Sequence, residues 1–450
     1  MALFHRRGLA ALALTLALTG SAHAQQKVSI DFWHGLPQPL GGLLEQVVAG
    51  FNASQAQYEI KPSFRGSYPE TMVSSIAAFR AGNAPHIVQM FEVGTATMMA
   101  ARGAVKPVHE LLAEAGVALD TNDYLPAIRG YYSTTDGKLM SMPFNSSTSI
   151  MFYNKEAFRK AGLDPEKAPA TWAELRAAAK KIKESGASAC AFTSSWPTWT
   201  QIEQVGAIHN VGVASKANGF GGPDATLDLT NPLFVRHLTT LVEMAKEGTY
   251  RYGGRDGAGD ALFASGECAI THASSGARAR YLKEVPGGIA NIGFAFLPYY
   301  SEVTTTPNNT VIGGASFWVM NAGPNKVRAR EELTGIAEFF KYISRVDIAS
   351  KWHIDTGYLP ITKSAFEAVK ATGYYDKNPG ADIPITELLR GTMTANSMGF
   401  RLGNFAEIRV AIQEEMERAI QGQQTPAAAL EAANKRGNEI LRAFERANRS

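Results

Sequence analysis

The sequence predicts an α/β protein with two lobes. Two stretches of the chain alternate short apolar segments, typical of strands, with longer segments whose apolar residues recur at helical spacing. Strands that alternate with helices are typical of a mainly parallel sheet flanked by helices. The chain has 450 residues, more than one hydrophobic core usually holds, so we expect two lobes.

The N-terminus has the features of a secretory signal peptide. A basic stretch at residues 5–7 precedes an apolar run over residues 8–19, and small residues at 21–24 fit the positions that a signal peptidase reads. We therefore expect residues 1–24 to form a signal peptide cleaved after Ala24, and the protein to be exported. No other apolar run approaches the roughly 20 residues that a membrane-spanning helix needs.

The charge balance argues against two classes of partner. The chain has 44 Lys plus Arg and 41 Asp plus Glu. Removal of Arg6 and Arg7 with the signal peptide leaves 42 against 41, a net charge of about +1. A near-neutral protein is a poor match for nucleic acid or for an anionic membrane surface.

The two cysteines, Cys190 and Cys268, each lie in an apolar, strand-like run. An oxidising compartment allows a disulfide between them without requiring one. Free cysteines are among the most buried residue types. We therefore favour two buried free thiols, with a disulfide as the alternative.

The first α/β stretch begins directly after the signal peptide. Strand-like and helix-like segments alternate in the order 28–33, 40–51, 58–61, 72–79 and 86–91. Ligands bind sheets of this kind beyond the carboxyl ends of the strands. That rule singles out Trp33, His34, the turn at 66–68, and Glu92.

The second α/β stretch begins with a polar patch that runs into an apolar strand at 150–153. The patch consists of Asn145, Ser146, Ser147 and Thr148. Small hydroxyls and free backbone N–H groups at such a position let a polar ligand approach closely. An ordinary Ser/Thr turn is the alternative, and taken alone the patch favours it.

A pair of tryptophans follows the next predicted strand. Thr171 and Glu174 form a capping box for a helix, a strand is expected at 190–193, and Trp196 and Trp199 come directly after it. Two indoles near a strand end can stack on the C–H face of a polyol. Core packing is the alternative for both.

Further along, small polar residues again follow predicted strands. Residues 271–276 come after the strand at 263–270, and Val311–Ser316 repeats the pattern. The chain closes with a helix ending near Gly422 and another that begins at Thr425 and Pro426.

Several motifs together resemble the extracytoplasmic solute-binding proteins of ABC importers. They are PFNSST, YNK, ATWAEL, FASGECAITHASSG, IGGASFWV, TGYLPIT and GFRLGN. YNK and TW-x-E-L are shared with members that bind maltose and other sugars. By contrast, FEVGTATMMA (91–100), TGYLPIT (356–362), KNPGAD (377–382) and RLGN (401–404) resemble members that bind glycerol 3-phosphate.

The resemblance implies the two-lobed periplasmic-binding-protein fold, with hinge strands and the ligand enclosed between the lobes. The first lobe would comprise residues 25–146 and 296–328, and the second 149–292 and 331–450. The protein would be periplasmic and monomeric before docking. Closed around its ligand, it would be recognised by a membrane permease, and a cytoplasmic ATPase would complete the importer.

The resemblance also implies a set of ligand contacts and no cofactor or metal. The set is Tyr68, Glu92, Ser147, Trp196, Trp199, Ser274, Gly314, Tyr358 and Arg401. Arg401 would grip phosphate oxygens with two N–H groups, and Ser147 would be among the neutral donors. Glu92 would accept from a glycerol hydroxyl. The implied ligand is sn-glycerol 3-phosphate, with glycerophosphodiesters such as glycerophosphocholine as further candidates.

His272 departs from the family pattern, which has a small polar residue there. It is interpreted as a buried histidine with satisfied hydrogen bonds; the alternative is a residue that tunes phosphate affinity with pH.

Two other functions fit parts of the sequence. One is a sugar or oligosaccharide binding protein of the same fold. The other is a periplasmic phosphodiesterase or glycoside hydrolase, although the chain has no G-x-S-x-G or H-E-x-x-H motif. Glycosidase carboxylates leave little sequence signature. The Gly-rich stretch at 253–260 is interpreted as a flexible surface turn. We expect a binding protein and not an enzyme.

Overall fold

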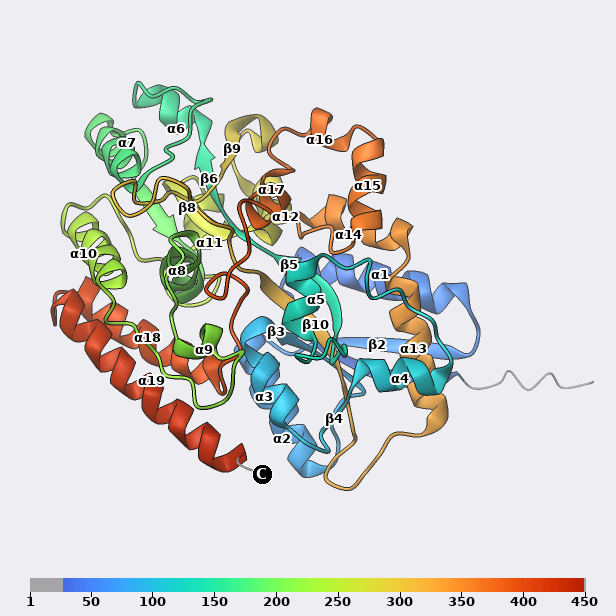
Figure 1. Ribbon diagram of the computed structural model, residues 1–450. Helices are drawn as coiled ribbons and strands as arrows, with labels where there is room; N and C mark the ends of the chain where they lie inside the picture. The colour runs from blue at the N-terminus through green and yellow to red at the C-terminus, as the bar shows by residue number, and fades with distance from the viewer. Residues whose placement is uncertain (1–26, 449–450) are drawn as a thin grey trace, which may run out of the picture.

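The computed structural model describes residues 27–448, which form two α/β lobes (Figure 1). The predicted signal peptide and its cleavage point lie outside the described residues. Within residues 27–448, no helix is both long and apolar enough to cross a membrane.

The first lobe is built on a six-stranded mixed sheet. Its order is β2-β1-β3-β10-β4, and β5 also pairs with β10. The strands are β1 (Val28–His34), β2 (Tyr58–Phe64), β3 (Ile87–Phe91), β4 (Val105–Lys106), β5 (Met142–Ser147) and β10 (Gly313–Met320). The helices are α1 (Leu40–Ser54), α2 (Tyr68–Ala81), the 3₁₀ turn η1 (Glu92–Gly94), α3 (Thr95–Ala100), α4 (Val108–Ala115), α5 (Pro126–Tyr132), α13 (Arg330–Ile343), α14 (Val346–Thr356), α15 (Lys363–Ala371) and α16 (Tyr374–Lys377).

The second lobe is built on a four-stranded sheet of order β7-β8-β6-β9. The strands are β6 (Ser149–Asn154), β7 (Cys190–Ser194), β8 (Cys268–Ser274) and β9 (Ile292–Ala295). The helices are α6 (Lys155–Lys160), α7 (Trp172–Ser185), the π-helix η2 (Trp199–Glu203), α8 (Gln204–Ile208), α9 (Ser215–Asn218), α10 (Pro232–Lys246), α11 (Asp260–Ala264), η3 (Ser275–Ala277), α12 (Arg278–Glu284), η4 (Gly288–Asn291), α17 (Ile383–Leu388), α18 (Phe405–Ile420) and α19 (Pro426–Asn448).

The α/β class and the two lobes are confirmed, but the sheets are mixed and not mainly parallel. β1 runs parallel to β2 and β3, and β7 runs parallel to β8. The strands next to the lobe crossing, β5, β6 and β10, run antiparallel to their neighbours. The crossing strands therefore give each sheet its mixed character.

Local signals in the sequence begin the helices as expected. The predicted capping box of α7 is present, with Thr171 Oγ1 accepting from Glu174 N at 3.2 Å. A second capping box, formed by Ser67 and Glu70, begins α2. Such boxes satisfy N–H groups that the first turn of a helix leaves free.

The position of α13 corrects the predicted lobe boundary at residue 331. α13 packs against β1 and α4, and α14 packs against α1, all in the first lobe. The apolar face of α13 packs on the sheet of the first lobe, where the Phe339 ring lies 6.3 Å from the Phe32 ring of β1. The chain returns to the second lobe before α17, which packs against β6.

Cys190 and Cys268 form a disulfide, so the prediction of free thiols is wrong. The two residues are directly paired in the parallel register of β7 and β8, with their Cα atoms 4.3 Å apart. The sequence showed that each run is buried, but it could not show that the two cysteines share one register position.

The disulfide closes a loop over a sequence separation of 78 residues. We expect the Cys190→Ala/Cys268→Ala double variant to lose about 2–4 kcal/mol of unfolding free energy, because the unfolded chain is no longer constrained. Urea denaturation measures this loss. Reductant should lower the wild-type midpoint and leave that of the variant unchanged. Equal midpoints for wild type and variant would contradict the prediction.

Glu387 in α17 is a fully buried carboxylate beside the second connection between the lobes. Its Oε1 accepts from Leu297 N at 2.8 Å, and its Oε2 has no hydrogen-bond partner among the described residues. Burial raises the pKa of Glu387 to about 8 from an ordinary value of 4.5, although Arg390 opposes this shift. The folded protein therefore binds this proton more tightly than the unfolded chain does.

It follows that the contribution of Glu387 to stability is fully present below about pH 4.5 and is lost as the pH rises through about 8. Glu387→Gln keeps an oxygen for Leu297 N and cannot ionise. We expect the variant to lie within about 1 kcal/mol of wild type at pH 5 and to exceed it by about 4 kcal/mol at pH 8.5, measured by urea denaturation. Glu367→Gln, at an exposed position, is the surface control for the same change of side chain. A difference at pH 8.5 no larger than that at pH 5 would contradict this expectation.

Candidate ligand-binding site

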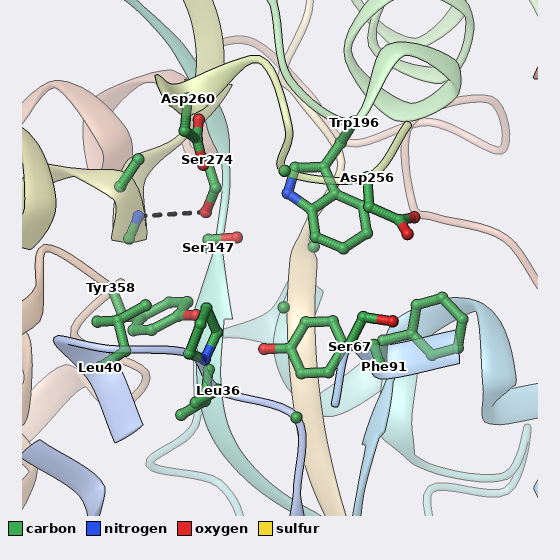
Figure 2. Close-up of a pocket in the computed structure, with 18 of the residues that line it drawn as sticks. Leu36, Leu40, Ser67, Phe91, Ser147, Trp196, Asp256, Asp260, Ser274 and Tyr358 are labelled. Atoms are coloured by element: carbon green, nitrogen blue, oxygen red, sulfur yellow. Dashed lines mark hydrogen bonds between the residues drawn. The ribbon is translucent and has the colours of Figure 1, made fainter. Parts of the chain in front are cut away.

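A cavity of about 320 Å³ lies between the two lobes and takes its walls from both. In Figure 2, Leu36, Leu40, Ser67 and Phe91 of the first lobe face Trp196, Asp256 and Asp260 of the second. Its residues follow the ends of β1, β3, β7 and β8. This is the position at which ligands bind open α/β sheets.

Eight of the nine predicted ligand contacts line the cavity. They are Tyr68, Glu92, Ser147, Trp196, Trp199, Ser274, Gly314 and Tyr358. The structure thus brings together residues that lie up to 290 positions apart, as the numbers 68 and 358 show. Their contact with a ligand stays a prediction.

The polar patch lies at the end of β5 and in the link to β6. Asn145 of this patch holds other residues in place, whereas Ser147 has a hydroxyl that is free to bind a ligand. Asn145 donates to the Tyr68 hydroxyl at 2.9 Å and accepts from Gln89 Nε2 at 2.8 Å. Gln89 Oε1 in turn accepts from Gly35 N at 2.9 Å. Asn145 therefore fixes Tyr68 and, through Gln89, the loop that follows β1.

Ser147 Oγ, by contrast, is buried and has no hydrogen-bond partner within residues 27–448. The same holds for Trp199 Nε1. A buried polar group without a partner costs about 1–3 kcal/mol. Because both residues line the cavity, a polar ligand there would remove this cost.

Gly313 and Gly314 let the walls of the cavity approach closely. Gly314 has φ +86°, and a Cβ at this position would lie 2.0 Å from Asn145 O. A Cβ on Gly313 would lie 2.5 Å from Trp199 Cζ2, so the indole of the second lobe packs on the backbone of the first. Glycine is required at both positions by contact, and at Gly314 by conformation as well.

A buried ion cluster joins the lobes at the cavity wall. Arg409 of α18 donates from Nε to Glu203 Oε1 at 2.6 Å and from Nη2 to Glu203 Oε2 at 2.7 Å. Nη2 also donates to Glu92 Oε1 in the first lobe at 2.6 Å. Burial raises the pKa of Glu92 and Glu203 adds to this, whereas Arg409 opposes it. Burial opposes the charge of Arg409, but the two carboxylates raise its pKa and keep it charged.

The structure places Arg401 apart from the other eight predicted ligand contacts. Arg401 does not line the cavity. Its Nη2 donates to the carbonyl oxygens of Gly130, Tyr131 and Ser133 at 3.1, 2.9 and 2.8 Å, and its guanidinium lies 4.4 Å from the centre of the Phe220 ring. Arg401 thus ties its loop to the end of α5, and the arginines that line the cavity are Arg280 and Arg409.

Residues 46–381 match the family model described as bacterial extracellular solute-binding protein. The chain belongs to this family. It is 43% identical over 442 residues to the sn-glycerol-3-phosphate-binding periplasmic protein UgpB of Yersinia pseudotuberculosis serotype I, covering 97% of this chain and 98% of that protein. The protein of the same name from Escherichia coli O6:H1 is 43% identical over 441 residues and 98% of both chains.

Solved structures share the fold of this solute-binding protein. UgpB from Mycobacterium tuberculosis in complex with glycerophosphocholine has a TM-score of 0.74 at 20% identity, over 93% of this chain and 99% of that one. The GacH receptor of Streptomyces glaucescens, solved unliganded and with acarbose, has a TM-score of 0.74 at 19% identity, over 93% and 100%. These likenesses concern the fold and confirm the two-lobed prediction.

Several cavity residues of this family member were not predicted from sequence. They are the loop 35–40, Asp256, Asp260, Arg280 and Arg409, whereas Ser67 belongs to the predicted turn at 66–68. The stretch 253–260 is thus part of the cavity wall and not only a surface turn. Asp260 accepts from Ser195 Oγ and from Tyr281 OH at 2.5 and 2.6 Å. The signal available for Arg409 was its place beside the apolar residues Ile408 and Ile412 on the buried face of α18.

His272 does not line the cavity. Its Nδ1 lies 3.3 Å from Gln201 Nε2, and its Nε2 has no hydrogen-bond partner among the described residues. Burial lowers the pKa of His272 to about 3. The interpretation as a buried histidine fits, although only one ring nitrogen is satisfied.

Proposed function

We propose that this protein is the periplasmic binding component of an ABC importer and captures sn-glycerol 3-phosphate between its lobes. The observation that carries the proposal is a cavity whose two sides differ chemically. Hydroxyl donors gather on one side, and an ion cluster with an indole lies on the other. The 43% identical relatives named as sn-glycerol-3-phosphate-binding proteins support this choice of ligand.

The phosphate group is assigned to the side formed by Ser147, Ser274 and Tyr358, which lie together in Figure 2. Ser274 Oγ accepts from Gly276 N at 3.2 Å, which leaves the Ser274 hydroxyl proton to donate. Burial raises the pKa of Tyr358, so its hydroxyl is a donor at neutral pH. Neutral donors bind an anion without a competing counter-ion.

The glycerol group is assigned to the side formed by Glu92, Arg409 and Trp196. An ionised Glu92 accepts from glycerol hydroxyls and repels phosphate, which fixes the direction in which the ligand lies. The Trp196 indole offers its face to the C–H groups of the glycerol chain.

Glycerophosphocholine is the second candidate ligand. Asp256 lines the cavity beside Trp196 (Figure 2) and would provide a counter-charge for a quaternary ammonium group. The solved relative from Mycobacterium tuberculosis is a complex with glycerophosphocholine.

The proposal includes the rest of the transport cycle. The chain is exported to the periplasm, its signal peptide is cleaved after Ala24, and it works as a monomer without a cofactor and without enzymatic activity. Closed around its ligand, it docks on a membrane permease whose cytoplasmic ATPase drives import.

A thermal-shift panel tests the ligand. Protein that has been unfolded and refolded to remove co-purified ligand is mixed with glycerol 3-phosphate, glycerophosphocholine, inorganic phosphate or maltose. A ligand that binds only the folded state raises Tm. At a ligand concentration of 100 times Kd, it adds about 2.7 kcal/mol to the free energy of unfolding. We expect glycerol 3-phosphate to raise Tm and maltose to leave it unchanged. No shift with either glycerol phosphate would contradict the proposed ligand.

Ser147→Ala tests the phosphate side. Because Ser147 Oγ has no hydrogen-bond partner among the described residues, the variant should be at least as stable as wild type. Its affinity for glycerol 3-phosphate should fall about 10–150-fold, the value of one hydrogen bond to a charged group. Calorimetric titration and urea denaturation measure the two effects.

Ser149→Ala is the matched control for this test. Ser149 Oγ is also buried without a partner but does not line the cavity. The control should bind glycerol 3-phosphate as wild type does. Equal affinity losses in the two variants would remove Ser147 from the site.

A further inference from the structure

We propose that Glu203 is a positioning residue of the ligand site. It holds the Arg409 guanidinium at the cavity wall, where this group can donate hydrogen bonds both to the ligand and to Glu92 of the opposite lobe. Glu203 itself does not line the cavity and acts only through Arg409. The inference rests on the proposed function and adds a residue behind the site that determines ligand affinity.

The geometry of the Glu203–Arg409 pair is that of a fixed, bidentate contact. Both Glu203 oxygens accept from Arg409, at 2.6 and 2.7 Å, and the two side chains are 1% and 9% exposed. Parallel N–H···O bonds of this kind set the plane of the guanidinium as well as its position. The pair is formed within the second lobe and so does not depend on lobe closure.

The backbone that carries Glu203 is itself held in place. Glu203 ends the π-helix η2, which begins at Trp199 of the cavity wall. Thr200 Oγ1 donates to Ser195 O at 2.9 Å, and Gln201 Oε1 lies 3.1 Å from His237 Nε2. π-Helical turns recur at functional sites, where they place several side chains in one region. Here η2 supplies both a cavity indole and the anchor of the cavity arginine.

Arg409 has one guanidinium nitrogen, Nη1, that neither Glu203 nor Glu92 uses. Glu203 takes Nε and one Nη2 proton, and Glu92 takes the other. Nη1 donates to no residue within 27–448, and Arg409 lines the cavity, so this nitrogen is available to a ligand. Without Glu203, Arg409 could turn fully to Glu92 and occupy the carboxylate that accepts from glycerol.

A merely neutralising role for Glu203 makes a different prediction. Glu203→Asp keeps the negative charge, but the side chain is shorter by one methylene group and its carboxylate lies farther from Arg409. If Glu203 only balances the charge of Arg409, this variant retains its affinity. If Glu203 positions Arg409, affinity falls although the charge remains.

The matched control is Glu415→Asp. Glu415 lies on α18, as Arg409 does, is 3% exposed like the buried Glu203, and accepts from Arg436 Nη1 at 2.7 Å, but it does not line the cavity. We expect the Kd for glycerol 3-phosphate to rise at least tenfold in Glu203→Asp and Glu203→Gln, and to stay within twofold of wild type in Glu415→Asp. An affinity within twofold of wild type in Glu203→Asp overturns the proposal.

A double-mutant cycle tests whether Glu203 acts through Arg409. Arg409→Lys keeps the charge and loses the bidentate contact. Glu203→Asp should therefore change Kd less than twofold in the Arg409→Lys background. An effect that persists undiminished in that background overturns the proposal, because Glu203 then acts by another route.

A readout without ligand separates this inference from the proposed function. The side-chain Nε–H signal of Arg409 in ¹⁵N NMR should exchange slowly with water in the ligand-free protein, because Glu203 accepts from it. We expect this protection to be lost in Glu203→Asp and kept in Glu415→Asp. Protection that survives in Glu203→Asp overturns the positioning role. A wild type that binds neither glycerol phosphate overturns the proposed ligand instead.

Discussion

The candidate site depends on the antiparallel pairing of β5 with β10 at the point where the chain passes between the lobes. Ser147 is paired with Gly313, and Ser146 with Gly314. The two strands can approach because residue 314 has no Cβ, which would lie 2.0 Å from Asn145 O. The pairing sets Ser147 in the cavity wall and gives the Trp199 indole a flat backbone surface on Gly313. One register therefore places a donor and an aromatic wall together.

Polar groups behind this register make the first lobe's wall rigid. Asn145 holds Tyr68 directly and holds the loop after β1 through Gln89. All the side-chain groups in this chain of bonds are buried, where a hydrogen bond is stronger than in water and a missing one is costly. A ligand therefore meets donors that are already in position. The ordering entropy that would otherwise reduce its affinity is largely absent.

The parts of this structure that the sequence predicted are local or carried by motifs. The alternation of strands and helices, the capping box at Thr171 and the cavity position of Ser147 belong to this group. The parts that it missed are set by pairs far apart in the chain. Cys190 meets Cys268 only through the register of two strands, and Arg409 meets partners at sequence separations of 206 and 317. Arg401 and Arg409 flank the start of one helix, and only these distant carboxylates distinguish them.

The division of contacts between the lobes explains why a ligand would close them. A ligand shifts an equilibrium between two conformations only by its difference in affinity for them. Ser147 and Glu92 lie on one lobe and Ser274 and Trp196 on the other, so a ligand in the cavity could contact all four only when the lobes are closed. The Arg409–Glu92 bond also crosses the lobes, but desolvation offsets most of the gain from a buried ion pair. That bond alone therefore supplies little closing energy, and the ligand must supply the rest. A permease that recognises the closed form would consequently respond to the loaded protein and pass over the empty one.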